Sequence, residues 1–177
     1  MTILGLQNLI QSATVEDTVD LKSICQKLKI KIRMDDSSQD LCKIGQNSDK
    51  QIIIWLKSSL DQKTKFTFVA IAVADYMLDS DRVCKQGVVY DMFFLRDLNA
   101  NKATKLIMLA TRLAMPEHII EKLSNALEVQ FSKDNKETFD ADAYVRDSKF
   151  LPEFVRCAIK ESTSIFLMDN LKNKYEH

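Results

Sequence analysis

The chain has 177 residues with 25 acidic and 25 basic side chains, so its formal net charge is zero. A neutral chain has no overall basic field for a phosphate backbone, which argues against direct binding of nucleic acid. Hydrophobic residues make up 46% and charged residues 28%, as is usual for a globular protein. Only three glycines and two prolines are present, which favours a helix-rich fold over a β-sandwich.

Neither the cysteines nor the histidines have the spacing of a metal site. The cysteines are Cys25, Cys42, Cys84 and Cys157, and the histidines are His118 and His177. Because no CxxC pair occurs, we predict no zinc site and no other cofactor, and we interpret the thiols as buried and free in a reducing cytoplasm. The start of the chain lacks the charged region of a signal peptide, and no apolar run reaches the ~18 residues of a membrane span. We therefore predict a cytoplasmic protein that does not enter a membrane.

Apolar residues at helical spacing predict two helices at the start of the chain. The first covers residues 3–12, where leucine and isoleucine share one face. The second covers residues 19–30, and Thr18 is its expected N-cap. Asp20 then lies at the positive end of the helix dipole, where an acid is favourable.

Three strands are predicted after these helices. KIKIR, residues 29–33, alternates between apolar and basic side chains, as in a half-exposed strand. LCKIG, residues 41–45, is interpreted as a second strand. QIIIWL, residues 51–56, is rich in β-branched residues and predicts a buried strand. Asp49-Lys50 is the expected turn between the last two strands.

KFTFVAIAVADYML, residues 65–78, predicts a helix that is apolar on nearly every side. Ser59 or Asp61 is the expected cap. One face carries a continuous apolar stripe made of Phe66, Val69, Ala70, Val73, Ala74 and Met77. Phe68, Ile71 and Ala72 make the opposite side apolar as well. Such a helix is expected to be buried on most sides.

The second half of the chain predicts one extended segment and three further helices. GVVYDMFFL, residues 87–95, is interpreted as extended chain. A long helix follows over residues 99–114, and Pro116 ends it and begins another over 116–127, because proline is well placed in a first turn. A last helix is predicted over residues 152–171.

This order of elements predicts the α+β class, with a helical body and a small sheet of about three strands. We divide the chain into a main domain over residues 1–130 and a C-terminal helical extension over residues 131–177 that packs on it.

Four segments in chain order carry a family resemblance. TVDLKSICQKLKIKI resembles an entry helix and strand written PVDLxxIAxxLGIxV, and KQIIIWLKSSLDQKTKFTFVAIAVADYML resembles a strand and a helix where members read RFTLAHELGHxLL. NKATKLIMLATRLAMPEHII resembles a later helix, ExxANxFAxxLLMP, and AIKESTSIFLMDNLK resembles the closing helix. The family is that of the ImmA/IrrE-type zinc metallopeptidases, and the match is best over residues 18–125. The resemblance implies a zincin-like fold.

The resemblance also implies that the catalytic motif is lost. Aligning the Phe-Thr pair at residues 66–67 puts the two zinc histidines of HExxH on Ala70 and Ala74, and the catalytic glutamate on Ile71. HExxH works because residues four apart share a helix face, so that two imidazoles bind one metal while the glutamate acts as general base. Methyl groups cannot bind zinc and isoleucine cannot accept a proton. We therefore predict an inactive pseudo-enzyme.

Lys105 is assigned to the third ligand position, which is acidic in the family, by counting back from Met115. Two interpretations remain open. Lys105 is a surface lysine, which we favour, or it enters the former metal cleft and pairs with an acid such as Asp75. The other acids near this helix, all predicted in loops, are Asp79, Asp81, Asp91 and Asp97. We interpret them as solvated and His118 as partly exposed, in preference to a rebuilt metal or acid–base site.

A domain without its chemistry is expected to act by binding. Active members of the family are similar to proteins that cut or antagonise helix-turn-helix repressors. We therefore predict a non-catalytic regulatory protein that binds a helix-turn-helix repressor of a phage or mobile element, in the manner of an antirepressor. The alternatives are a toxin–antitoxin component, a self-associating structural protein or, least favoured, a residual peptidase.

One segment is a candidate contact for such a partner. Tyr90, Met92, Phe93 and Phe94 are residue types enriched in protein interfaces. The alternative, given equal weight, is that this segment is a core strand or a loop packed over the helices.

Overall fold

The computed structural model describes residues 3–15, 18–91, 94, 98–116, 118–120 and 146. In chain order, the elements are α1 (Ile3–Gln11), β1 (Thr14–Val15), β2 (Thr18–Val19), α2 (Leu21–Lys27), β3 (Ile30–Met34), β4 (Cys42–Gln46), β5 (Ile52–Leu56), α3 (Gln62–Leu78), α4 (Ser80–Gln86), β6 (Val88–Tyr90) and α5 (Ala100–Ala114). The predicted α+β class is confirmed. None of the described helices is both long and apolar enough to cross a bilayer.

The main sheet has four strands within the described residues, in the order β3-β5-β4-β6, instead of the predicted three or so. β3 runs parallel to β5, whereas β4 is antiparallel to both of its neighbours. The additional strand, β6, lies in the segment that was predicted only as extended. Its pairing partner, β4, is more than 40 residues earlier in the chain, so local sequence could not reveal it.

The predicted turn between β4 and β5 is confirmed. Lys50 has a φ of 58°, and its backbone N–H donates to the carbonyl oxygen of Asn47 at 3.0 Å. The side-chain Oδ1 of Asn47 accepts from the backbone N–H groups of Asp49 and Gln51 at 3.1 and 2.8 Å. An asparagine side chain that bonds the backbone two residues ahead is a common way to close a turn.

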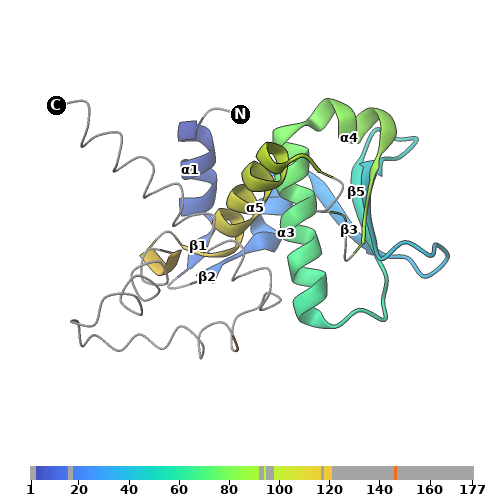
Figure 1. Ribbon diagram of the computed structural model, residues 1–177, viewed down its shortest axis with the longest axis horizontal. Coiled ribbons are helices and arrows are strands. Elements are labelled where there is room, and N and C mark those ends of the chain that lie inside the picture. Colours follow the sequence, from blue (N-terminus) through green and yellow to red (C-terminus); the bar gives the residue numbers. More distant parts are fainter. Residues whose placement is uncertain are drawn as a thin grey trace.

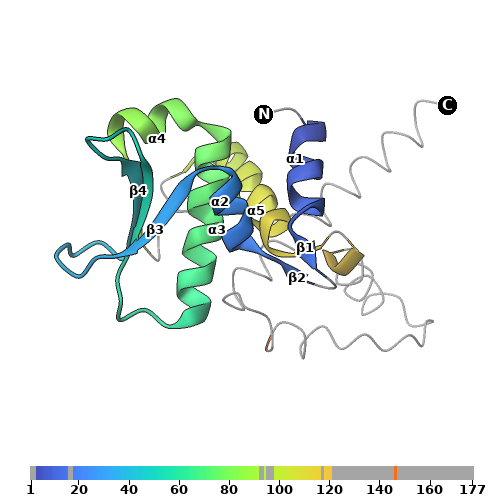
Figure 2. The same ribbon diagram turned by 180° about the vertical axis from the view of Figure 1, so that it is seen from behind.

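Helix α3 lies between the sheet on one side and α5 on the other (Figures 1 and 2). This position explains why α3 is apolar all round: both of its long faces are covered. Ten of its residues are buried: Thr64 and the nine residues from Thr67 to Asp75. Asp61 is the N-cap, as expected, and its side chain accepts from the backbone N–H of Thr64 at 3.0 Å.

One local expectation, the cap at the start of α2, was wrong. Thr18 is not the cap of α2, because it belongs to β2 and pairs with Val15 in a short antiparallel hairpin. The cap is Asp20, whose Oδ1 accepts from the backbone N–H groups of Lys22 and Ser23. An aspartate cap serves the same purpose as a threonine cap, so the sequence pattern alone did not distinguish the two.

Helix α4 was not expected at all. Asp79, predicted in a loop, is its N-cap, and Asp81 lies in its first turn. The helix has only seven residues, and Val83 is its one buried side chain, so it lacks an apolar stripe that periodicity could detect. Gly87 ends it with a φ of 67°, in the left-handed region that favours glycine.

Several expectations concern residues outside the described part of the chain. The helix predicted to begin at Pro116 is seen at 118–120, and its remainder lies beyond the described residues. The helix predicted over 152–171 and the division into 1–130 and 131–177 also fall there, as do Met92 and Phe93.

Candidate functional site

The positions aligned with HExxH are all in the core. Ala70 and Ala74 are 0% exposed and Ile71 is 4% exposed. Leu106 and Ala110 of α5, which packs against α3, are fully buried as well. Their burial leaves no groove at these three side chains in the part of the chain that the structure describes.

The third ligand position needs a correction. In the pattern ExxANxFAxxLLMP the acid precedes the methionine by twelve positions, so a strict count from Met115 reaches Ala103, and the assignment to Lys105 is two residues too far along the helix. Lys105 is exposed, in agreement with the favoured interpretation as a surface lysine. Neither alanine nor lysine is a ligand that zinc takes in proteins.

Asp75 is the acid that the structure buries, with 1% of its side chain exposed. Its Oδ1 forms an ion pair with Nη2 of Arg82 from α4, and its Oδ2 accepts a hydrogen bond of 2.9 Å from the hydroxyl of Tyr90 in β6. The alternative pairing of Asp75 with Lys105 is therefore wrong. We call Asp75, Arg82 and Tyr90 the Asp75 cluster.

The Asp75 cluster joins three elements, one residue from each of α3, α4 and β6. Burial, followed by the neighbouring charge of Asp75, raises the pKa of Tyr90 far above its usual value of 10, so the hydroxyl keeps its proton and donates to the carboxylate. Arg82 also approaches Asp79, with 3.4 Å between Nε and Oδ2. A buried acid with both oxygens occupied by protein donors has a structural role.

The aromatic segment after β6 is only partly available as a contact surface. Tyr90 is 0% exposed, so for this residue the core-strand alternative holds. Phe94 is half-buried, and its ring meets that of Tyr90 edge to face with 4.8 Å between centroids. These two of the four proposed contact residues thus pack against each other.

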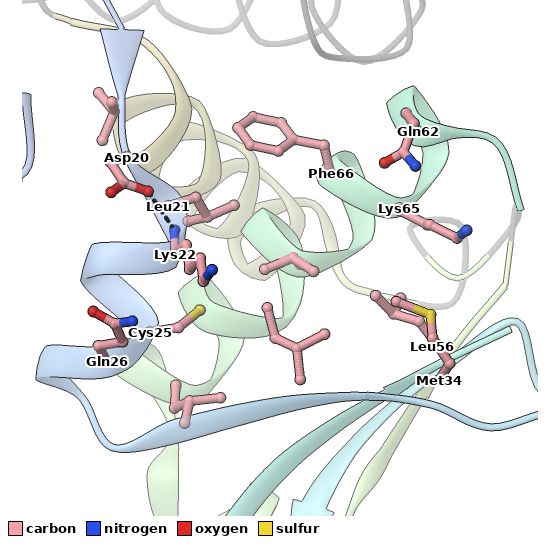
Figure 3. A pocket seen from close by; sticks show the side chains of 14 residues that line it. Asp20, Leu21, Lys22, Cys25, Gln26, Met34, Leu56, Gln62, Lys65 and Phe66 are labelled. Carbon is pink, nitrogen blue, oxygen red and sulfur yellow. Dashed lines mark hydrogen bonds between the residues drawn. The ribbon is translucent and has the colours of Figure 1, made fainter. Parts of the chain in front are cut away.

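An open groove lies elsewhere, between α2, β3 and α3, with a volume of about 530 Å³ (Figure 3). Its apolar lining includes Leu21, Cys25, Ile32, Met34, Phe66 and Val69. The polar side chains that line it are Asp20, Lys22, Gln26, Gln62 and Lys65. We call this site the β3 groove. Its volume lies within the range typical of binding sites in proteins.

The most exposed part of the β3 groove is the strand itself. Ile32 is 37% exposed and Met34 is 55% exposed, although both are large and apolar. The predicted half-exposed strand over residues 29–33 is confirmed, but the sequence did not mark it as part of a site. β3 lines a groove because it is an end strand of the sheet and because α2 and α3 lie beside it. The tertiary structure shows this arrangement, whereas the local sequence does not.

Cys25 is a potential nucleophile in the lining of the β3 groove, and its environment lowers its reactivity. Burial, and to a lesser degree the charge of Asp20, raises the pKa of its thiol from 9.0 to about 12. Because the thiolate is the reactive form, a thiol that stays protonated at neutral pH is a poor nucleophile and a poor metal ligand. Cys25 therefore contributes apolar lining to the β3 groove.

Within the described residues, no three His, Cys, Asp or Glu side chains come together as a metal site would require. His118 is exposed, somewhat more than the partial exposure expected. What the described surface offers chemically is an apolar concave site with polar and basic groups around it, suited to binding.

Comparison with protein-family models, with curated proteins and with solved structures found no match to this chain. The resemblance to the ImmA/IrrE-type metallopeptidases therefore rests on the four sequence segments. The structure itself provides an α+β fold, a closely packed α3 and an open groove beside β3.

Proposed function

We propose that this chain is a non-catalytic regulatory protein, a zincin-like pseudo-enzyme that works by binding another protein. The observation that carries the proposal is the β3 groove, where Ile32 and Met34 present apolar surface beside an open concavity. Exposed apolar surface of this kind is typical of interaction sites. The aliphatic side chains at positions 70, 71 and 74 support the non-catalytic part, because they supply neither metal ligands nor a base.

The partner we propose is a helix-turn-helix repressor of a phage or mobile element, as the family resemblance suggests. By occupying part of the repressor, the protein holds it away from its operator without cleaving it. The zero net charge of the chain supports an action on the repressor in preference to the DNA, since a neutral protein gains little from contact with phosphates.

The test uses the purified full chain and the helix-turn-helix repressor encoded nearest to its own gene. We expect the two to co-elute in size-exclusion chromatography, and we expect the protein to reduce the repressor's affinity for operator DNA while the repressor stays intact in mass spectrometry. A repressor that binds its operator equally well with and without the protein would contradict the proposal. Cleavage of the repressor, or one equivalent of zinc by elemental analysis, would contradict the non-catalytic part.

A further inference from the structure

β3 is an end strand of the sheet, and its outer edge is free of any strand within the described residues. The backbone N–H of Asp35, just after β3, donates to the carbonyl oxygen of Leu56 at 2.8 Å. Because the backbone groups of alternate residues in a strand point to the same side, those of Lys31 and Arg33 also face β5. The backbone groups of Ile32 and Met34 therefore face outward, where a further strand would pair.

The side chains of these two residues line the β3 groove, so the open edge and the concavity belong to one site. A strand added at this edge would place alternate side chains next to Ile32 and Met34, on the face that α2 and α3 enclose. Ile30, at the start of β3, is only 4% exposed, whereas Met34 at its end is 55% exposed. The surface available to an added strand is therefore at the end of β3 nearest Met34.

The charges around this edge indicate what kind of segment it accepts. Lys31 and Arg33 are exposed on the opposite face of β3, and Lys22 and Lys65 line the groove. None of these four cations forms an ion pair within the described part of the chain. Lys65 donates to the carbonyl oxygen of Ser58 at 2.8 Å, and Asp20 is the acid in the groove lining. Cations outnumber acids among these groups, so an acidic segment would complement the charge of this edge better than a basic one.

Charge disfavours a second copy of the chain at this edge when the two strands are centred on Ile32. In that symmetric antiparallel pair, Lys31 of one copy would lie across from Arg33 of the other. Like charges in opposing cross-strand positions are destabilising, and lysines on end strands commonly prevent such self-pairing.

We propose that the β3 groove binds an extended segment of the partner protein by strand addition, and that this segment alternates apolar residues with Asp or Glu. The apolar side chains enter the groove beside Ile32 and Met34, and the acids face the surrounding cations. Main-chain hydrogen bonds provide affinity in this recognition mode, and the pockets for alternate side chains provide specificity. The inference rests on the proposed function only in that the partner is a protein.

The test begins with a phage-displayed library of random peptides of about twelve residues, selected on the immobilised full chain. We expect the enriched peptides to alternate β-branched or aromatic residues with acids. Peptides with apolar residues at helical spacing, or no enrichment, would overturn the proposal. In a fluorescence-polarisation assay with the best synthetic peptide, N-methylation of one set of alternate amides should abolish binding, while methylation of the other set should leave affinity within about twofold. Equal tolerance of both sets would exclude strand addition.

Matched variants locate the site. Met34→Glu should lower the affinity for the peptide by about tenfold or more, because it removes apolar contact and repels the acidic side chains of the peptide. Val89→Glu makes the same chemical change at a residue that is 47% exposed on β6, the strand at the other end of the sheet, and should leave affinity unchanged. Equal effects of the two variants would overturn the proposal. Urea unfolding of both confirms that each is folded.

The same variants separate this inference from the proposed function. If the repressor binds the wild-type chain and Met34→Glu binds it equally well, strand addition at β3 is wrong and the regulatory function stands. If selected peptides bind at β3 but the repressor does not bind, the repressor is the wrong partner and the binding mode stands.

Discussion

Replacing Asp75 by alanine tests whether the Asp75 cluster holds α3, α4 and β6 together. The change removes a carboxylate that is 1% exposed and leaves two donors without an acceptor. Tyr90 is 0% exposed, and an unsatisfied buried hydroxyl costs about 1–3 kcal/mol. Arg82 is 27% exposed and can turn toward water. Loss of its ion pair is therefore expected to cost about 1 kcal/mol, which is less than the cost of leaving a fully buried charge unpaired. We expect a total loss of about 3 kcal/mol.

The measurement is urea unfolding followed by circular dichroism. With a slope of about 2 kcal/mol per molar urea, the midpoint should fall by about 1.5 M. Tyr90→Phe removes only the hydroxyl and leaves the ion pair, so it should cost about 1 kcal/mol. In the double variant, the two losses should sum to more than the measured loss, because both remove the same hydrogen bond.

Asp81→Ala is the matched control. It removes the same chemical group from the neighbouring helix α4, but Asp81 is 87% exposed and its contact with Lys85 is 4.0 Å long. Exposed pairs of this kind contribute little, so we expect a loss below about 0.5 kcal/mol. If Asp75→Ala is no more harmful than Asp81→Ala, the argument that the cluster is structural fails.

Four further predictions concern buried side chains and a helix cap. The double substitution Ala70→His with Ala74→His should destabilise the fold by about 3 kcal/mol or more, because two imidazoles must fit into a closely packed core. A folded double variant that binds one zinc ion would show that these positions are not in the core. At pH 8.5, iodoacetamide followed by mass spectrometry should label the half-buried Cys84 before the buried Cys25. Since burial raises the pKa of Cys25 from 9.0 to about 12, its contribution to stability is complete below pH 9 and should be lost at about 1.4 kcal/mol per pH unit as the pH rises from 9 toward 12; a flat urea midpoint over pH 8–11 would contradict this. Asn99→Ala removes the cap of α5, whose side chain accepts a 2.9 Å hydrogen bond from the backbone N–H of Lys102. It should lower the free energy of unfolding by about 1 kcal/mol in the same urea assay, whereas Asn101→Ala, in the exposed first turn, should leave it unchanged. Equal effects of the two variants would argue against capping.

The sequence predicted those parts of the fold that depend on neighbouring residues. The stripe on α3 predicted a buried helix, the alternation over residues 29–33 predicted β3, and Asp49-Lys50 predicted the turn before β5. Each of these patterns reflects which side of a local element meets the core.

What the sequence could not predict depends on residues far apart in the chain. Asp75 is buried because Arg82 and Tyr90, from two other elements, reach its oxygens, and no local pattern encodes that meeting. In the same way, the β3 groove exists because β5 rather than β4 is the neighbour of β3. Ile32 and Met34 look like ordinary strand residues until that order is known.

The order of strands also bears on how the molecule assembles. β4 and β5 are joined by a turn of a few residues and form a local hairpin. β3 pairs with β5 although β4 lies between them in the chain, so this pairing closes a longer loop. Because closing a longer loop costs more entropy, the hairpin is expected to form early during folding and β3 to dock late. β3 has one neighbouring strand whereas β5 has two, so β3 is easier to detach than β5. Amide hydrogens of β3 should therefore exchange with solvent faster than those of β5, and an added strand from a partner should slow them.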